Sequence, residues 1–110
     1  MVYLHKQQAA GEWNKRSLLF QMANIGSEVI RALNWREKQN KEYAQNAFER
    51  SLELFDLTVA DVKNKYRLKE VLRAREAWVD FFAYDNEYNS TREQWEKYFL
   101  AFNWAARINV

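Results

Sequence analysis

The sequence contains no cysteine and no proline, and it has only one histidine and two glycines among its 110 residues. Without cysteine, neither a disulfide nor a thiolate metal site can form, and the single His5 excludes a metal site built from several histidines of one chain. The shortage of glycine and proline argues against a sheet protein, because the tight turns of a sheet need these residues. We therefore expect an all-α protein with few helices.

Long apolar runs are also missing. No run approaches the roughly 20 residues that a membrane-spanning helix needs, so we expect no membrane partner. The N-terminal segment MVYLHKQQAAG has no continuous apolar core and does not match a secretory signal. These features predict a cytoplasmic location.

Aromatic residues are present in surplus, at 16% of the chain with five tryptophans. Each aromatic ring buries a large area, so these residues can fill the core of a small helical domain or form an exposed docking surface. Most of them fall on helical stripes, which favours the core. The length and the apolar fraction of 48% correspond to a single domain with one core, residues 1–110.

Apolar residues recur at spacings of three and four, which is typical of helices that bury one face. The expected helices span about 17–38, 42–61, 67–84 and 91–107. Ser17 is predicted to cap the first, and Ser90 with Glu93 matches a capping box that would start the last at Thr91. Segment 42–61 has a broad apolar face, as expected for a helix with neighbours on two sides. The short connections predict an up-and-down antiparallel four-helix bundle.

Each of the two glycines suggests a structural feature. In residues 1–16, Gly11 is expected to end a short helical turn, leaving a partly ordered N-terminal arm with Trp13 tucked against the bundle. Gly26 lies inside the first expected helix, where glycine costs about 1 kcal/mol. We expect a packing reason for it, namely the close approach of a neighbouring helix, and a backbone contact to a ligand is the alternative.

No strong catalytic pattern is present: the sequence has no glycine-rich phosphate loop, no nucleophile elbow and no HExxH motif. A Ser–His–Asp arrangement would have to use His5 in the arm. Glu49, Glu53, Asp56 and Asp61 are predicted to form a solvated acidic face of the second helix rather than a metal site. We expect no catalytic residue, no metal and no cofactor, and a protein that is not an enzyme is favoured.

Polar side chains on the first and third helices form one candidate site. Glu28 and Arg31 lie one turn apart, and Arg75 and Asp80 offer a similar mixed set. If the two sets face each other, they form a polar layer that fixes the register of the helices. Such a layer can alternatively hold a small polar ligand.

Positive charge is concentrated between residues 63 and 75, although the formal net charge of the chain is only +2. The candidate nucleic-acid contacts are Lys63, Lys65, Tyr66, Arg67, Lys69 and Arg73. The basic groups can contact phosphates, and Tyr66 can stack on a base. The preceding helix is acidic, so the two segments can instead neutralise each other.

Leu100 and Trp104 fall off the apolar stripe of the last helix. An exposed apolar pair of this kind indicates a self-association surface, and burial under the N-terminal arm is the alternative. We predict a helical bundle that acts through protein–protein contact, as a homo-oligomer or with another protein. An RNA- or nucleotide-associated bundle that uses the basic segment is the alternative function.

The size, the four-helix pattern and the polar third helix resemble small HEPN-type proteins, a class of bundles linked to RNA cleavage or to nucleotidyltransferase partners. Active members carry an arginine followed four to six residues later by a histidine. Here Arg75 is followed at those distances by Val79, Asp80 and Phe81. The resemblance therefore implies a partner-binding relative without the nuclease chemistry. The stretch SLLFQMANIGSEVIRALNW is also similar to small prokaryotic helical proteins, without implying a function.

Overall fold

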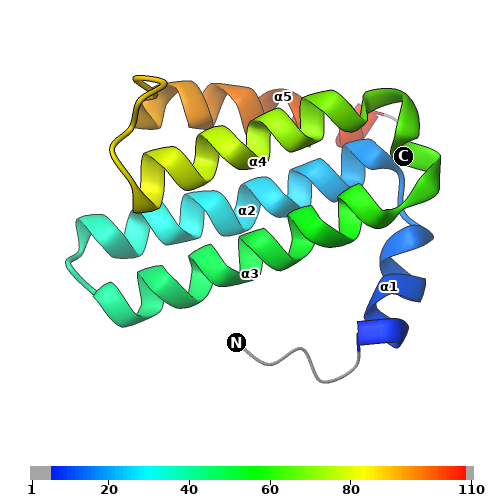
Figure 1. Cartoon of the computed structure of the whole chain (residues 1–110), viewed down its shortest axis with the longest axis horizontal. Helices are drawn as coiled ribbons and strands as arrows, with labels where there is room; N and C mark the ends of the chain where they lie inside the picture. Colours follow the sequence, from blue (N-terminus) through cyan, green and yellow to red (C-terminus); the bar gives the residue numbers. More distant parts are fainter. Residues whose placement is uncertain (1–5, 109–110) are drawn as a thin grey trace.

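The computed structural model describes residues 6–108, and within this range all regular structure is helical (Figure 1). The elements are α1 (Lys6–Asn14), α2 (Leu18–Glu37), α3 (Lys41–Ala60), the 3-10 helix η1 (Val62–Arg67), α4 (Leu68–Ala83) and α5 (Arg92–Ile108). The predicted all-α class is confirmed. The described residues hold five α-helices, however, so the prediction of four was incomplete.

The four long helices follow one another in alternating directions along the molecule (Figure 1). α2 packs against both α3 and α5, and α3 also packs against α4. The expectation that the segment around 42–61 has neighbours on two sides is therefore confirmed. α1 lies at one end of the molecule, where it packs against α3 (Figure 1).

Trp78 of α4 is the centre of an aromatic core. Its side chain is fully buried, and its ring centroid lies 5.2 Å from that of Phe82 and 5.8 Å from that of Trp95. The indole Nε1 donates a hydrogen bond to the buried Ser51 Oγ at 2.9 Å, so this large ring is buried without an unpaired polar atom. The preference of the aromatic residues for the core is confirmed here. Leu72 of the same helix lies outside this core and is 44% exposed.

Gly26 marks a close approach of α2 and α5. A Cβ added at this position would lie 2.6 Å from Phe99 Cβ and 2.7 Å from Phe99 Cγ, far inside normal carbon contact. Only glycine leaves room for Phe99 against the backbone of α2. The predicted packing reason for Gly26 is therefore confirmed, and it brings α5 onto α2.

The helix starts are capped largely as predicted. Ser17 Oγ accepts a hydrogen bond from the backbone N–H of Phe20 at 3.2 Å, which confirms its capping role. The capping box of α5 was predicted one residue too early, because it is Thr91 that accepts from the N–H of Gln94 and Gln94 that accepts from Thr91.

The shift of the capping box has a local cause in the loop before α5. The side chain of Asn86 bonds both backbone groups of Ser90, accepting from its N–H at 2.8 Å and donating to its carbonyl at 2.9 Å. These two bonds hold Ser90 in the loop. The next residue, Thr91, therefore becomes the cap.

The described part of the N-terminal arm, residues 6–16, contains a longer helix than expected. α1 continues through Gly11 to Asn14, so the prediction that Gly11 ends a short turn is wrong. The contact of Trp13 with the remainder of the fold is confirmed, since its Nε1 donates to Thr58 Oγ1 of α3 at 2.9 Å. His5 lies outside the described residues.

A buried polar network joins α2, α3 and η1 beside the end of α1. The side chain of Gln21 donates to the Trp13 carbonyl and to Asp61 Oδ2, both at 2.9 Å, and accepts from Asn64 at 2.7 Å. Burial acts to raise the pKa of Asp61, but hydrogen bonds from Lys63 and Gln21 outweigh it and hold the pKa below its usual value. The network thus fixes the turn from α3 into η1 with a charged carboxylate.

Candidate functional site

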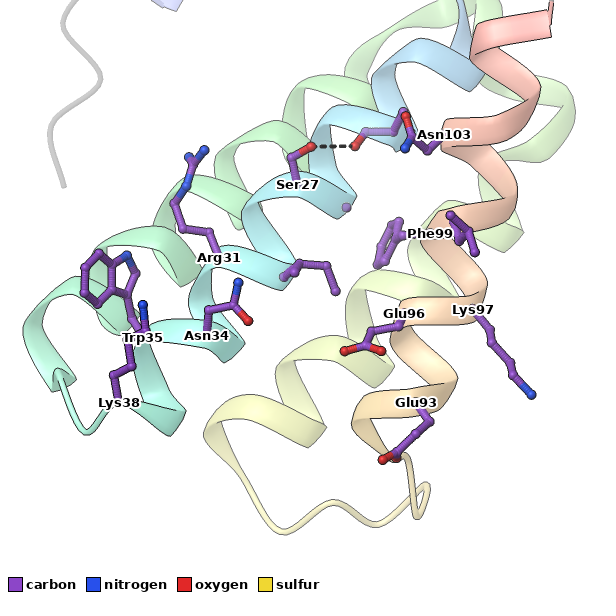
Figure 2. Close-up of a pocket in the computed structure, with 14 residues that line it drawn as sticks. Ser27, Arg31, Asn34, Trp35, Lys38, Glu93, Glu96, Lys97, Phe99 and Asn103 are labelled. Carbon is purple, nitrogen blue, oxygen red and sulfur yellow. Dashed lines mark hydrogen bonds between the residues drawn. The ribbon is translucent and has the colours of Figure 1, made fainter.

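A groove of about 880 Å³ runs between α2 and α5 (Figure 2). The close contact of Phe99 with Gly26 lies within it, and Ile30 and Leu100 are further apolar lining residues. Asn34 and Glu96 point into the space between the two helices from opposite sides (Figure 2). The groove therefore combines an apolar lining with polar groups from both helices, as a binding groove does.

Arg92, the first residue of α5, ties α5 to the end of α2. Its guanidinium donates to Asn34 Oδ1 and to Glu37 Oε2, each at 2.5 Å, and its Nε donates to Glu96 Oε1 at 2.5 Å. Such charge-assisted bonds to three partners position a helix more firmly than one exposed ion pair. Arg92 was not predicted from the sequence, because its partners on α2 are more than fifty residues away.

The outer face of α5 carries an exposed apolar stripe made of Leu100, Trp104 and Ile108. Their side chains are 63%, 65% and 64% exposed, and the spacing of four residues puts them on one side of the helix. Leu100 also lines the groove, so the stripe continues into it. The alternative prediction, that Leu100 and Trp104 are buried under the N-terminal arm, is wrong. Both side chains are exposed, and α1 packs against α3. Ile108 was missed, although the same spacing predicts it.

The four residues of the predicted polar layer, Glu28, Arg31, Arg75 and Asp80, make their contacts in three separate places. Glu28 is buried on α2 and pairs with Arg31 at 2.6 Å. Arg75 instead bonds Asp56 of α3 at 2.9 Å. Asp80 accepts two backbone N–H groups of the loop after α4, at 2.9 and 3.1 Å. The Arg75–Asp56 contact joins neighbouring helices and the Asp80 contacts hold the loop, whereas the Glu28–Arg31 pair lies within α2.

The basic segment is partly neutralised. Lys63 pairs with Asp61 and also donates to the Asn14 carbonyl at 3.1 Å, and Arg67 pairs with Glu70. Tyr66 is 76% exposed on η1. The remaining basic residues of the segment are exposed: Lys65, Lys69 and Arg73. Within residues 6–108, the exposed basic side chains of this segment that form no ion pair are thus these three, around η1 and the first turns of α4.

A second, smaller cavity of about 420 Å³ lies between α4 and α5. Trp95 and Tyr98 line it, and the indole Nε1 and the hydroxyl of these two residues are buried without a hydrogen-bond partner among residues 6–108. Burial raises the pKa of Tyr98 to about 12, helped by the nearby Glu70 carboxylate and opposed by Arg67. Tyr98 is therefore neutral at physiological pH, and its unpaired hydroxyl is a cost to the fold.

No family model, no curated protein and no solved structure matches the chain. In the part of the chain that the structure describes, no helix combines the length and the apolar character that crossing a membrane requires. Across the same residues, no group of three or more histidine, aspartate or glutamate side chains is placed to hold a metal ion. The candidate site is the exposed apolar stripe on the outer face of α5 together with the adjoining groove.

Proposed function

We propose that the protein is not an enzyme and that it works through protein–protein contact, associating with itself through the outer face of α5. The observation that carries this proposal is the stripe of Leu100, Trp104 and Ile108, each about two-thirds exposed and continuous with the α2–α5 groove. Fully burying one large apolar side chain contributes about 1.5–3 kcal/mol, so covering this stripe favours association. A contiguous apolar surface of this kind is typical of interaction sites.

The proposal includes the finer description of the fold as an up-and-down four-helix bundle of α2–α5, to which α1 is added at one end. The alternating directions of the long helices support it (Figure 1). In such a bundle α5 is held on a rigid base by Phe99 and Arg92, which leaves its outer face free to receive a partner. A partner-binding relative of HEPN-type proteins remains compatible with this proposal.

Replacing Trp104 with glutamate tests the proposal, because a charge at the middle of the stripe opposes its burial. We expect the Trp104→Glu variant to be monomeric at concentrations where the wild-type chain self-associates, as measured by sedimentation velocity. Val62→Glu is the matched control, since Val62 is an apolar residue that is 87% exposed on η1. Equal association of both variants would show that the interface lies elsewhere.

A second candidate function is RNA binding, favoured by the exposure of Tyr66 among Lys65, Lys69 and Arg73. Binding through phosphates weakens as salt concentration rises, so an RNA complex would be salt-sensitive. Replacing the three basic residues with alanine should then reduce affinity for single-stranded RNA, whereas Lys41→Ala, an exposed lysine on α3, should not. Unchanged affinity in the triple variant would exclude this segment as the binding site.

A further inference from the structure

Charge and apolar character alternate along the outer face of α5 in an ordered way. Glu93, Leu100 and Arg107 follow one another at intervals of seven residues, and all three side chains are exposed. Seven residues are close to two helical turns, so these side chains form an almost straight row. The row begins with a negative charge, has an apolar residue at its centre and ends with a positive charge about 21 Å further along the axis.

A second row lies beside the first and contains Lys97 and Trp104, which are also seven residues apart. Lys97 is exposed, and although it also lines the α2–α5 groove, its side chain extends away from α2 (Figure 2). It therefore belongs to the outward face of the helix together with the apolar stripe. A cation and an indole on one face can complement the same face of a second helix.

We infer that the partner on this face is a second copy of the chain, bound with the two α5 helices antiparallel about a twofold axis at Leu100. This inference rests on the proposed self-association. A twofold interface pairs a surface with itself, so any residue that meets another is met by it in return. With Leu100 on the axis, Glu93 lies opposite Arg107 of the partner subunit, and Arg107 lies opposite Glu93 of the partner subunit.

The same antiparallel arrangement also brings the two residues of the second row next to each other across the interface. An antiparallel pair about a perpendicular twofold axis brings the same flank of both helices together, and Lys97 then lies beside Trp104 of the partner subunit. A parallel pair would instead place Glu93 against Glu93 and Arg107 against Arg107, with like charges adjacent. The order of charges on α5 thus favours one orientation, which is how electrostatic complementarity gives specificity.

Two charge reversals test this orientation. In Glu93→Arg, each chain carries a positive charge at both ends of the row, and in Arg107→Glu each carries a negative charge at both ends. We expect each variant alone to self-associate about tenfold more weakly than wild type at low salt, because two attractions become repulsions. Mixing the two variants should restore association as a heterodimer, because both opposed pairs are then of opposite sign.

Native mass spectrometry of the mixture, with one variant isotopically labelled, measures the heterodimer directly. Glu42→Arg is the matched control, since Glu42 is also an exposed glutamate in the first turn of its helix, here α3. It should associate as wild type does and show no preference for Arg107→Glu. The preference of the swapped pair should fade at high salt, where exposed charges are screened.

The outcomes separate the orientation from the proposed function. If wild type dimerises and Trp104→Glu does not, but Glu93→Arg and Arg107→Glu each dimerise as wild type and mix at random, the antiparallel register is wrong and the α5 interface stands. If wild type stays monomeric at high micromolar concentration, the self-association itself is overturned. Preferential pairing of the two reversed variants supports both.

Discussion

Replacing Gly26 with alanine should destabilise the protein, although the same change usually stabilises a helix. The new Cβ would lie 2.6 Å from Phe99 Cβ and 2.9 Å from Phe99 Cδ1. Carbon atoms pack at about 3.5–4.0 Å, so a shift of about 1 Å is required. Phe99 Cβ is attached directly to the backbone of α5, and a rotation of the side chain cannot move it away. The strain must therefore be taken up by displacing α5 from α2.

The two effects of this substitution have opposite signs and known sizes. Overpacking of a core costs about 1–3 kcal/mol, whereas alanine gains about 1 kcal/mol over glycine in a helix. The net change should be a loss of about 1 kcal/mol in the free energy of unfolding, and up to about 2 kcal/mol. For a chain of this size, that corresponds to a fall in Tm of roughly 4 °C per kcal/mol.

Gly11→Ala is the matched control, because Gly11 lies in α1 with no atom within 4 Å of an added Cβ. This variant should be as stable as wild type or more stable, by up to about 1 kcal/mol. Urea unfolding followed by circular dichroism measures both variants. If Gly26→Ala gains as much stability as Gly11→Ala, then Phe99 does not pack on the α2 backbone and the account of the α2–α5 contact is wrong.

Two further predictions concern buried polar groups. Tyr98→Phe should raise the free energy of unfolding by about 1 kcal/mol, because it removes a buried hydroxyl that has no partner among residues 6–108. A loss of stability in this variant would show that the hydroxyl binds a water or another partner. The pKa of Tyr98 in the folded protein is raised from 10.0 to about 12, so its titration costs the fold no stability below pH 10 and an increasing amount as the pH rises towards 12. Tyr98→Phe should accordingly unfold less readily in alkali, as followed by circular dichroism. Asp61→Asn should lower stability at neutral pH by about 1.5–3 kcal/mol, because it weakens charge-assisted bonds from Lys63 and Gln21. The pKa of Asp61 in the folded protein is lowered from 3.8, so the stability that its carboxylate contributes is present above pH 3.8 and is lost as the pH falls through the lowered pKa. An acid-unfolding curve that is the same in Asp61→Asn as in wild type would contradict this.

The long helices were predictable because each carries a local signal. Apolar residues at spacings of three and four placed α2, α3, α4 and α5 within one residue of their bounds. The helix α1 was predicted only as a short turn ending at Gly11, since its full length depends on contacts of Trp13 with Thr58 and with Gln21. The contact with Thr58 joins residues that are 45 positions apart, and no pattern within a single segment reports such a contact.

In the candidate site, too, residues with a local sequence signal were predicted, and residues placed by distant contacts were not. Leu100 and Trp104 stood out on the sequence because they fall off the buried stripe of their own helix, which is a local property. The position of Arg92 across Asn34 and Glu37 depends on how α5 lies on α2, and this is set by the Gly26–Phe99 contact. The pattern identified a close helix approach at Gly26, but it did not identify Phe99 as the residue that makes it.

The mass of the wild-type chain as a function of concentration tests the proposed self-association most directly. Sedimentation equilibrium at low salt should show the average mass rising from that of the 13.3 kDa monomer towards that of a dimer as the concentration increases. A mass that stays at 13.3 kDa up to high micromolar concentration would contradict the proposal that α5 joins two copies of this chain.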